Sequence, residues 1–438
     1  MSRKPRRPLG YSVILALATA GLAATALAGE PPPGLAAAPT PLAPASVVPP
    51  APAQIAWSPA VAPKPLSNAV LRGLEFLAKH QLPDGGWGQG EEASSMGRGM
   101  NELSERANVA DTCITVLALM RAGSSPREGQ HAVAVLRGVE FVLAKIENAD
   151  ADSLSVTDVN GTRVQGKLGT YVDTFMASLM LAEAKGQMPD AARETRLDRG
   201  LNKVLHKIEL NQRADGGFES AGWAPVLAQA VAGKGLNIAA QKGAVVSGES
   251  RKKFEQWADR QYDERAGSFG ADGSAGVGLY AAAATVGTLN ESKNTRSMER
   301  AEARKRLADR QPMSAAENSR AATEIREAGE VEASADAAQR GALKQMEDPS
   351  FVAGFGSNGG EEFLSYMLLA ESLVAKGGPD WAAWDKSMTG NLGRVQNADG
   401  SWTGHHCITG RNFVTSAALL VLTADRAQVP LAGKLERG

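Results

Sequence analysis

Cysteine and histidine, the side chains best suited to bind zinc or to act as nucleophiles, are scarce in this sequence and gather at two places. The 438-residue chain has two cysteines and five histidines. Cys113 follows Asp111 by two positions, and His405, His406 and Cys407 are consecutive. Thiolates, imidazoles and carboxylates are the ligands of tetrahedral zinc sites. If the fold brings the two segments together, they predict a metal centre.

The same residues have other interpretations. Cys113 and Cys407 could form a single disulfide, which an exported protein permits, or both could be free, buried thiols. Asp111 could be no more than a helix N-cap, because a carboxylate accepts the free amide protons of a first helical turn. A Cα–Cα distance of roughly 4.4–6.8 Å would favour the disulfide. Convergence of the sulfurs and a histidine nitrogen at roughly 2.0–2.3 Å from one point would favour zinc.

A motif that occurs three times indicates which elements position these residues. Each copy reads Gln, two residues, Asp-Gly, a small residue and an aromatic residue, and each follows an apolar-periodic segment of helix length. The copies occupy residues 81–87, 212–218 and 396–402. Such an internal repeat predicts an architecture built from one recurring unit.

Each unit predicts an amphipathic outer helix followed by a buried inner helix. Residues 71–80 place apolar side chains on one helical face, whereas residues 109–120 are apolar on nearly all sides and require burial. Further outer and inner helices are predicted at 136–147 with 172–184, 197–210 with 221–232, 254–261 with 277–289, and 381–395 with 413–423, with a fifth inner helix at 361–375.

Six helical hairpins can close on themselves, so we predict an all-α fold, an α/α toroid over residues 66–438, in preference to an open solenoid. Ring closure makes the first and sixth inner helices neighbours, and Cys113 and Cys407 then lie at the same mouth of the barrel. Four other polar residues lie near the starts of inner helices and could meet a polar ligand at that mouth: Tyr171, Glu361, Glu362 and Arg411.

The N-terminal segments indicate export. Residues 1–28 have a basic start, an apolar run and a small-x-small ending, which is typical of a secretory signal peptide. An uncleaved membrane anchor is the alternative, since the apolar run is nearly long enough to cross a bilayer. Residues 29–65 are mostly Pro and Ala and predict an extended linker. We therefore expect a periplasmic or extracellular protein that meets the membrane only through its first residues.

Charge excludes one class of partner and marks one insertion. The net charge of −1 offers no broad basic surface for nucleic acid. Residues 292–347 are rich in Arg, Glu, Ala and Lys, and they predict a charged insertion that is helical or disordered. The linker and the insertion together suit display of the domain to a protein partner.

The three motifs resemble the Gln-Trp repeats of squalene–hopene and related triterpene cyclases, and the similar repeat of protein prenyltransferase β subunits. The wider pattern of Arg72-Gly73, Gln81 and Gly86-Trp87 carries this resemblance. In that superfamily the motif is structural, which implies a stabilising role for Gln81, Asp84, Trp87, Gln212, Asp215, Phe218, Gln396, Asp399 and Trp402.

The resemblance also bears on chemistry. Cyclases protonate their substrate with an acid at the position of Ala110, so cyclase-type protonation is not expected here. An aromatic content of 5% also argues against the stabilisation of carbocations. Prenyltransferase β subunits bind zinc through an Asp-x-Cys pair and a later histidine, which implies Asp111 and Cys113 with His405 or His406. The adjacent His406 and Cys407 also resemble the zinc ligands of lanthionine cyclases.

Two functions follow from the sequence. The first is an exported enzyme, transferase-like or hydrolase-like, with a zinc or thiol centre at the mouth of a cavity that holds a small apolar or chain-like ligand. The second is a non-catalytic binding or scaffold module at the cell envelope. The lining of the barrel separates them, because acids around a wide cavity favour the enzyme and a filled interior favours the scaffold.

Overall fold

Six inner helices pack side by side in a closed ring. Each contacts the next, and the last contacts the first. In chain order they are α3 (Val109–Arg121), α6 (Val172–Ala184), α8 (Pro225–Gln241), α10 (Gly278–Ala308), α12 (Gly360–Lys376) and α14 (Arg411–Leu422). Helices that are apolar on nearly all sides are stable only when neighbours enclose them, and the ring provides that enclosure.

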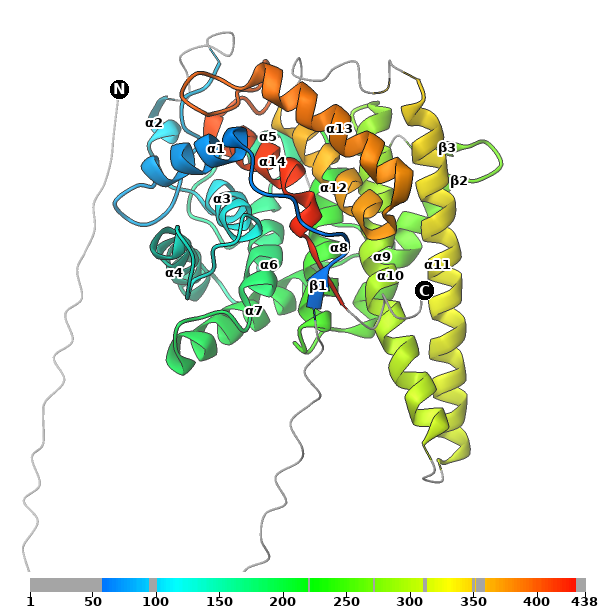
Figure 1. Ribbon diagram of the computed structural model, residues 1–438. Coiled ribbons are helices and arrows are strands. Elements are labelled where there is room, and N and C mark those ends of the chain that lie inside the picture. The colour runs from blue at the N-terminus through cyan, green and yellow to red at the C-terminus, as the bar shows by residue number, and fades with distance from the viewer. Residues whose placement is uncertain are drawn as a thin grey trace, which may run out of the picture. The chain divides into compact units, whose positions relative to one another are not determined.

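In the part of the chain that the structure describes, six amphipathic helices form the outer layer, and Figure 1 shows them around the inner helices. In α1, for example, Val70, Leu74 and Leu77 are buried while Leu71 is exposed. The outer helices are α1 (Asn68–Lys79), α4 (Ala132–Asn148), α7 (Ala191–Asn211), α9 (Gly248–Arg260), α11 (Ala315–Met346) and α13 (Gly378–Val395). The predicted all-α toroid of six helical hairpins is confirmed. Because every outer helix returns the chain to the same end, the inner helices run parallel and their N-terminal ends share one mouth.

The structure, a computed structural model, describes residues 57–93, 101–219, 221–270, 272–309, 313–348, 351 and 359–430. The signal peptide predicted at 1–28 lies outside these residues. Short elements complete the described part: α2 (Asn101–Ser104), α5 (Arg163–Leu168), the 3₁₀ helix η3 (Ala424–Arg426), and a hairpin of β2 (Tyr262–Asp263) with β3 (Ser268–Phe269). None of the helices in the described part is long and apolar enough to cross a membrane.

The folded unit begins earlier than the predicted boundary at residue 66. Strand β1 (Trp57–Pro59) pairs antiparallel with β4 (Gln428–Pro430), so both ends of the domain meet. The Lys64 backbone N–H donates to the Asp425 carboxylate at 2.7 Å. The Pro- and Ala-rich composition concealed this strand, because its partner lies at the other end of the chain.

The segment predicted as a charged insertion at 292–347 is helical where the structure describes it. Residues 292–308 continue the inner helix α10, and α11 is the outer helix of the fifth hairpin. The two helices extend together past the rest of the described unit (Figure 1). Small buried side chains let them approach closely, and ion pairs such as Arg300–Glu332 at 2.8 Å join them. The buried alanines are Ala303, Ala321, Ala328, Ala335, Ala338 and Ala342.

The glutamine of each repeat motif ties its own turn to the next outer helix. The Gln81 amide donates to the carbonyls of Gly85 and Ala134 at 2.8 and 2.9 Å. Gln396 repeats this with Gly400 and Ala69, both at 2.8 Å, and so connects the last hairpin to the first. Gln212 does the same with Gly216 and Ser250, both at 3.3 Å. The aspartates Asp84, Asp215 and Asp399 each accept an N–H two residues later and fix the turn.

The tryptophans of the first and third motifs fill the space behind these turns. Trp87 and Trp402 are fully buried, and their indole N–H groups donate to the carbonyls of Leu77 and Leu392 at 2.8 and 2.9 Å. The Trp402 ring lies against Gly73 of the next outer helix, where a Cβ would come within 2.8 Å of it. Glycine is therefore required wherever an indole packs on the neighbouring backbone.

Candidate functional site

The mouth formed by the N-terminal ends of the inner helices collects buried acidic groups. Asp111 lies in the first turn of α3, and Asp173 lies in the first turn of α6. Glu361 and Glu362 lie in the first turn of α12, and all four side chains are at most 1% exposed. Helix N-termini favour negative charge, but burial opposes it. The protonation of each carboxyl group therefore depends on its hydrogen bonds.

Asp173 has a structural role. One carboxylate oxygen accepts the Ala110 backbone N–H at 3.1 Å, and the other accepts the Gln165 amide at 2.7 Å. It thereby caps α3 from the neighbouring helix. Burial raises the pKa of Asp173 to about 6, although both hydrogen bonds act to lower it.

Asp111 is less well satisfied. Asn108 Nδ2 donates to Asp111 Oδ2 at 2.6 Å, and Asp111 Oδ1 has no hydrogen-bond partner. Burial raises the pKa of Asp111 to about 7, with a smaller contribution from the negative charge of Asp173. Asp111 is not the N-cap of α3, because the Asn108 side chain has that role and accepts the Asp111 backbone N–H at 2.9 Å.

The two cysteines are free thiols with different surroundings. Cys113 is fully buried in the core next to Asp173, and burial raises its pKa well above the ordinary value. Cys407 lies in the loop before α14 with a backbone φ of 65°, a conformation that residues other than glycine rarely adopt. Its sulfur lies 3.0 Å from His406 Nδ1. The predicted disulfide is not formed in this structure.

The donor set predicted for zinc does not converge. Within the ranges the structure describes, no three His, Cys, Asp or Glu side chains are arranged to hold a metal ion. Burial raises the pKa of both thiols. Asp111 and Cys113, in the first turns of α3, therefore do not fit a zinc centre with His405, His406 and Cys407.

The residues that do gather around Cys407 come from three elements. The Glu361 carboxyl group and the Lys167 ammonium group both lie beside its thiol. Glu361 Oε2 also accepts the Ile408 backbone N–H at 3.3 Å, while Oε1 has no hydrogen-bond partner. Burial raises the pKa of Glu361, against the effect of these hydrogen bonds and of the Lys167 charge. Lys167, at the end of α5, also lies over the Trp223 ring.

Several buried polar atoms without a partner lie at this mouth, between α12, α14 and α3. Such atoms are rare in folded proteins, and they usually mark water or ligand sites. Five of them lie in the segments that begin these inner helices or precede them: Gln89 Nε2, Asp111 Oδ1, Glu361 Oε1, Thr409 Oγ1 and Asn412 Oδ1.

The opposite end of the barrel is closed by a buried ion-pair network. Glu371 of α12 lies 2.9 Å from Arg121 of α3 and 2.9 Å from Lys234 of α8. Neither of those helices is next to α12 in the ring, so the pairs cross the interior. Arg121 also pairs with Glu183 at 3.3 Å, and Lys234 pairs with Glu291 at 2.9 Å. The interior at this level is therefore filled and charged.

This ion-pair network was not predicted from the sequence, although the sequence contains a signal for it. Its members interrupt segments that are otherwise apolar or small, and a charged residue inside a buried helix requires a partner. Lys167 carried no comparable signal, because an exposed and a mouth-facing lysine look alike in a short polar segment.

Comparisons with known proteins support the fold more than any activity. No protein-family profile matches the chain. An 85-residue stretch is 34% identical to α-onocerin synthase from Lycopodium clavatum, covering 19% of this chain and 11% of that protein. The chain therefore spans only a small part of this curated relative. The likeness to terpene cyclases is partial.

A solved structure has the same architecture. An inactive variant of an α-1,6-mannanase from Salegentibacter sp., in complex with α-1,6-mannotriose, matches with a TM-score of 0.51 over 82% of this chain and 98% of that chain. The sequence identity is 10%, so this likeness establishes the toroid and leaves the chemistry to the residues themselves.

Replacing Asp111 with asparagine should reduce the pH dependence of stability. The pKa of Asp111 is raised from 3.8 to about 7 on folding, so the folded state holds an extra proton between these values and stability falls as pH rises through this window. Ionisation of the buried Asp111 carboxyl group lowers the free energy of unfolding at pH 8 by a few kcal/mol, since one pKa unit corresponds to about 1.4 kcal/mol. Asp111→Asn should therefore be more stabilising at pH 8 than at pH 4 in urea denaturation. An equal effect at both pH values would contradict the buried, protonated state of this carboxyl group.

Proposed function

We propose that this protein binds a polyhydroxylated chain, a short oligosaccharide, at the mouth formed by the N-terminal ends of its inner helices. The observation that carries the proposal is the group of unpartnered buried polar atoms at that mouth. Asp111, Glu361 and Asn412 offer oxygen acceptors, whereas Gln89 offers an amide donor. Sugar hydroxyls both donate and accept, so one bound chain could satisfy both kinds of group, each of which is costly to leave buried and unpaired.

The filled interior argues against a long apolar ligand threaded through the barrel. Such a ligand would have to lie against Arg121, Lys234 and Glu371, which are at most 8% exposed and paired with one another. Displacing any of them would leave a buried charge without its partner. The predicted apolar cavity is therefore replaced in this proposal by a polar site at the mouth.

The mannanase relative supports the choice of first ligand. That structure is a complex of α-1,6-mannotriose with an inactive variant in which two consecutive aspartates are replaced. This chain has consecutive carboxyl groups at Glu361 and Glu362, in the first turn of an inner helix. A raised pKa suits a carboxyl group to donate a proton near neutral pH, and burial raises the pKa of Glu361. Hydrolysis of the bound chain is the activity to examine first.

A non-catalytic module is the second candidate, and the filled interior of the barrel favours it. The α10–α11 hairpin extends past the ring (Figure 1), and its exposed faces carry many ion pairs, which suits a protein partner better than a small ligand. Under this alternative the exported toroid binds its chain without cleaving it and presents it, or itself, at the cell envelope.

Calorimetry with α-1,6-mannotriose tests the proposal, with cellotriose and farnesol as comparison ligands. We expect saccharide binding that weakens about tenfold in Glu361→Gln, which replaces a carboxyl oxygen with an amide nitrogen that cannot accept a hydrogen bond. Asp380→Asn is the control, because Asp380 lies on the outer helix α13 and pairs with Lys376 at the end of α12. Product analysis after overnight incubation separates the hydrolase from the binding module. Binding of farnesol with no saccharide binding would refute the proposal.

A further inference from the structure

The second repeat motif departs from the other two at three matched positions. Phe218 stands where the others have Trp87 and Trp402. The next outer helix differs as well. The motif glutamines bind the carbonyls of Ala134, Ser250 and Ala69 in the first, second and third motifs. The residue four positions later is Gly138 in the first case and Gly73 in the third, but Phe254 in the second.

The third difference concerns the inner helix. The hydroxyl groups of Thr112 and Thr415 accept the backbone N–H of the motif tryptophan, both at 2.9 Å. In the second motif Gln229, at the start of α8, contacts the turn instead, and its amide donates to the Gly216 carbonyl at 3.2 Å.

These changes rearrange the packing behind the turn. Phe254 is fully buried and comes from the outer helix, at the position where glycine otherwise admits the indole ring. Phe218 is only partly buried and lies beside Phe175 and Phe254, with ring centroids 4.8 and 5.9 Å away. It has no indole N–H with which to bind the preceding helix. Phe218 therefore does not fill the space behind its turn in the way that Trp87 and Trp402 do in the other two motifs.

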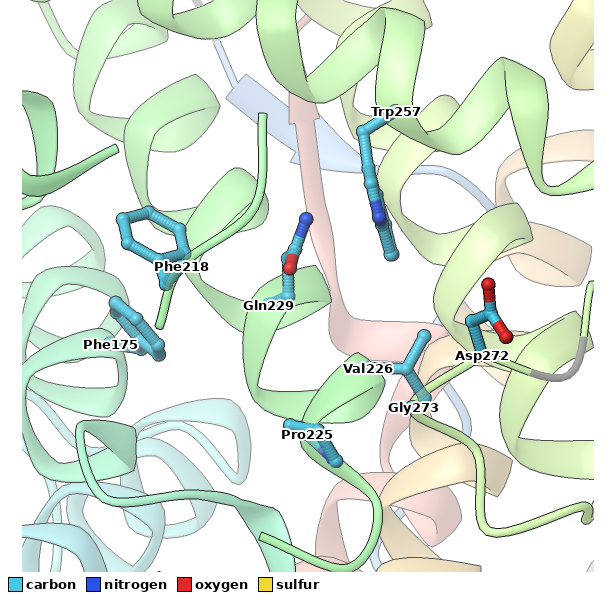
Figure 2. A pocket seen from close by; sticks show the side chains of 8 residues that line it. All are labelled: Phe175, Phe218, Pro225, Val226, Gln229, Trp257, Asp272 and Gly273. Atoms are coloured by element: carbon cyan, nitrogen blue, oxygen red, sulfur yellow. The ribbon is translucent and has the colours of Figure 1, made fainter. Parts of the chain in front are cut away.

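A pocket of about 100 Å³ opens at this place. Figure 2 shows Phe175 and Phe218 on one side, Trp257 and Asp272 on the other, and Gln229 between them. Pro225, Val226 and Gly273 complete the lining. The pocket lies between the starts of α6 and α8 and the outer helix α9, so it is separate from the group of residues around Cys407.

The lining combines aromatic rings with oxygen acceptors. Phe175, Phe218 and Trp257 supply aromatic rings, whose faces attract cations. Asp272 adds a carboxylate, and Gln229 adds an amide oxygen, since its nitrogen is engaged by Gly216. None of the lining residues that the structure describes is a lysine or an arginine. This composition disfavours anions. A neutral apolar group would gain nothing from the Asp272 carboxylate, whereas a cation would be attracted to it.

We propose that this pocket binds an organic ammonium group, either free or at the end of a larger molecule. The aromatic rings would surround the cationic head, and the Asp272 carboxylate would balance its charge. This site is independent of the saccharide site proposed at the barrel mouth, because none of its lining residues belongs to that site.

Calorimetry of the full chain with choline tests the site, with 3,3-dimethylbutan-1-ol as the neutral analogue of the same shape. We expect choline to bind about tenfold more tightly than the neutral alcohol, because cation–π attraction to the aromatic rings and the charge of Asp272 both favour the cation. Asp272→Asn should weaken choline binding about tenfold. Asp259→Asn should not, because Asp259 is exposed on α9 and does not line the pocket.

Phe218→Trp supplies a second variant. It restores the residue of the other motifs and should fill the pocket and abolish choline binding, while the melting temperature shows that the fold persists. Equal binding of choline and the neutral alcohol, or equal effects of Asp272→Asn and Asp259→Asn, would overturn the proposal. Competition between choline and mannotriose would also overturn it, because the pocket would then be part of the saccharide site.

Discussion

Truncating Trp402 to alanine should lower the free energy of unfolding by about 3–5 kcal/mol, the usual cost of removing a large buried aromatic side chain. Trp402 is fully buried, and its indole N–H donates to the Leu392 carbonyl at 2.9 Å. Truncation would leave that carbonyl without its partner and a cavity against Gly73 and Leu419.

The position of Trp402 adds to the expected effect. Its motif joins the last hairpin to the first through the bonds of Gln396 to Ala69 and Gly400. A cavity there weakens the closure of the ring, which every other hairpin depends on for burial of its inner helix.

Phe218→Ala is the matched comparison, measured by urea denaturation under the same conditions. Phe218 occupies the equivalent position in the second motif but is partly exposed and makes no side-chain hydrogen bond of the indole type. It should cost clearly less than Trp402→Ala. Equal costs, or an unchanged midpoint for Trp402→Ala with a loss of ligand binding, would show that the motif serves function instead of stability.

The fold could be predicted because its signals are local and repeated. Segments such as 71–80 show on which face they are buried, and the three motifs mark where three of the outer helices, α1, α7 and α13, end. The strand at Trp57–Pro59 could not be predicted, because its only partner is at Gln428–Pro430. Pairing between distant ends leaves no periodic signal in a three-residue segment.

The candidate site was only partly predictable. Scarcity drew attention to the segments around the starts of the first and sixth inner helices, which include Asp111 and Cys407. It did not show how each side chain points, and side-chain direction decides whether Cys113 faces the core or a metal. Whether metal or disulfide forms under other conditions stays a prediction without support from this geometry.

Charges inside the inner helices carried more information than the cysteines. Glu371 illustrates this, since a glutamate within the apolar segment 361–375 is buried whichever way that helix turns. The sequence could thus predict that Glu371 needs a cation. It could not identify Arg121 and Lys234 as its partners, because that pairing crosses the ring.

Replacing Glu371 with glutamine should destabilise the protein by about 3–5 kcal/mol, as is usual when one partner of a buried ion pair is removed. Glu371 lies between two cations, Arg121 and Lys234, each 2.9 Å away. The neutral amide would leave two buried positive charges facing each other without the anion between them. Asp380→Asn breaks an ion pair of similar length, Lys376–Asp380 at 2.8 Å, whose side chains are 47% and 38% exposed. Exposed pairs contribute about 0–1 kcal/mol, so this control should scarcely change the urea midpoint.

The pH dependence of the Glu371→Gln effect distinguishes a lost charge from a packing defect. Burial alone would raise the pKa of Glu371, but the charges of Lys234 and Arg121 outweigh it and hold the pKa below the ordinary value. A carboxyl group whose pKa is lowered on folding contributes stability that is fully present above its unfolded pKa of about 4.3 and that is lost as pH falls through its folded pKa. The difference between wild type and Glu371→Gln should therefore be largest near pH 7 and shrink in acid, below pH about 4. A difference that stays constant down to pH 3 would mean that glutamine disturbs packing, and that the closed, charged interior does not depend on the ionised Glu371.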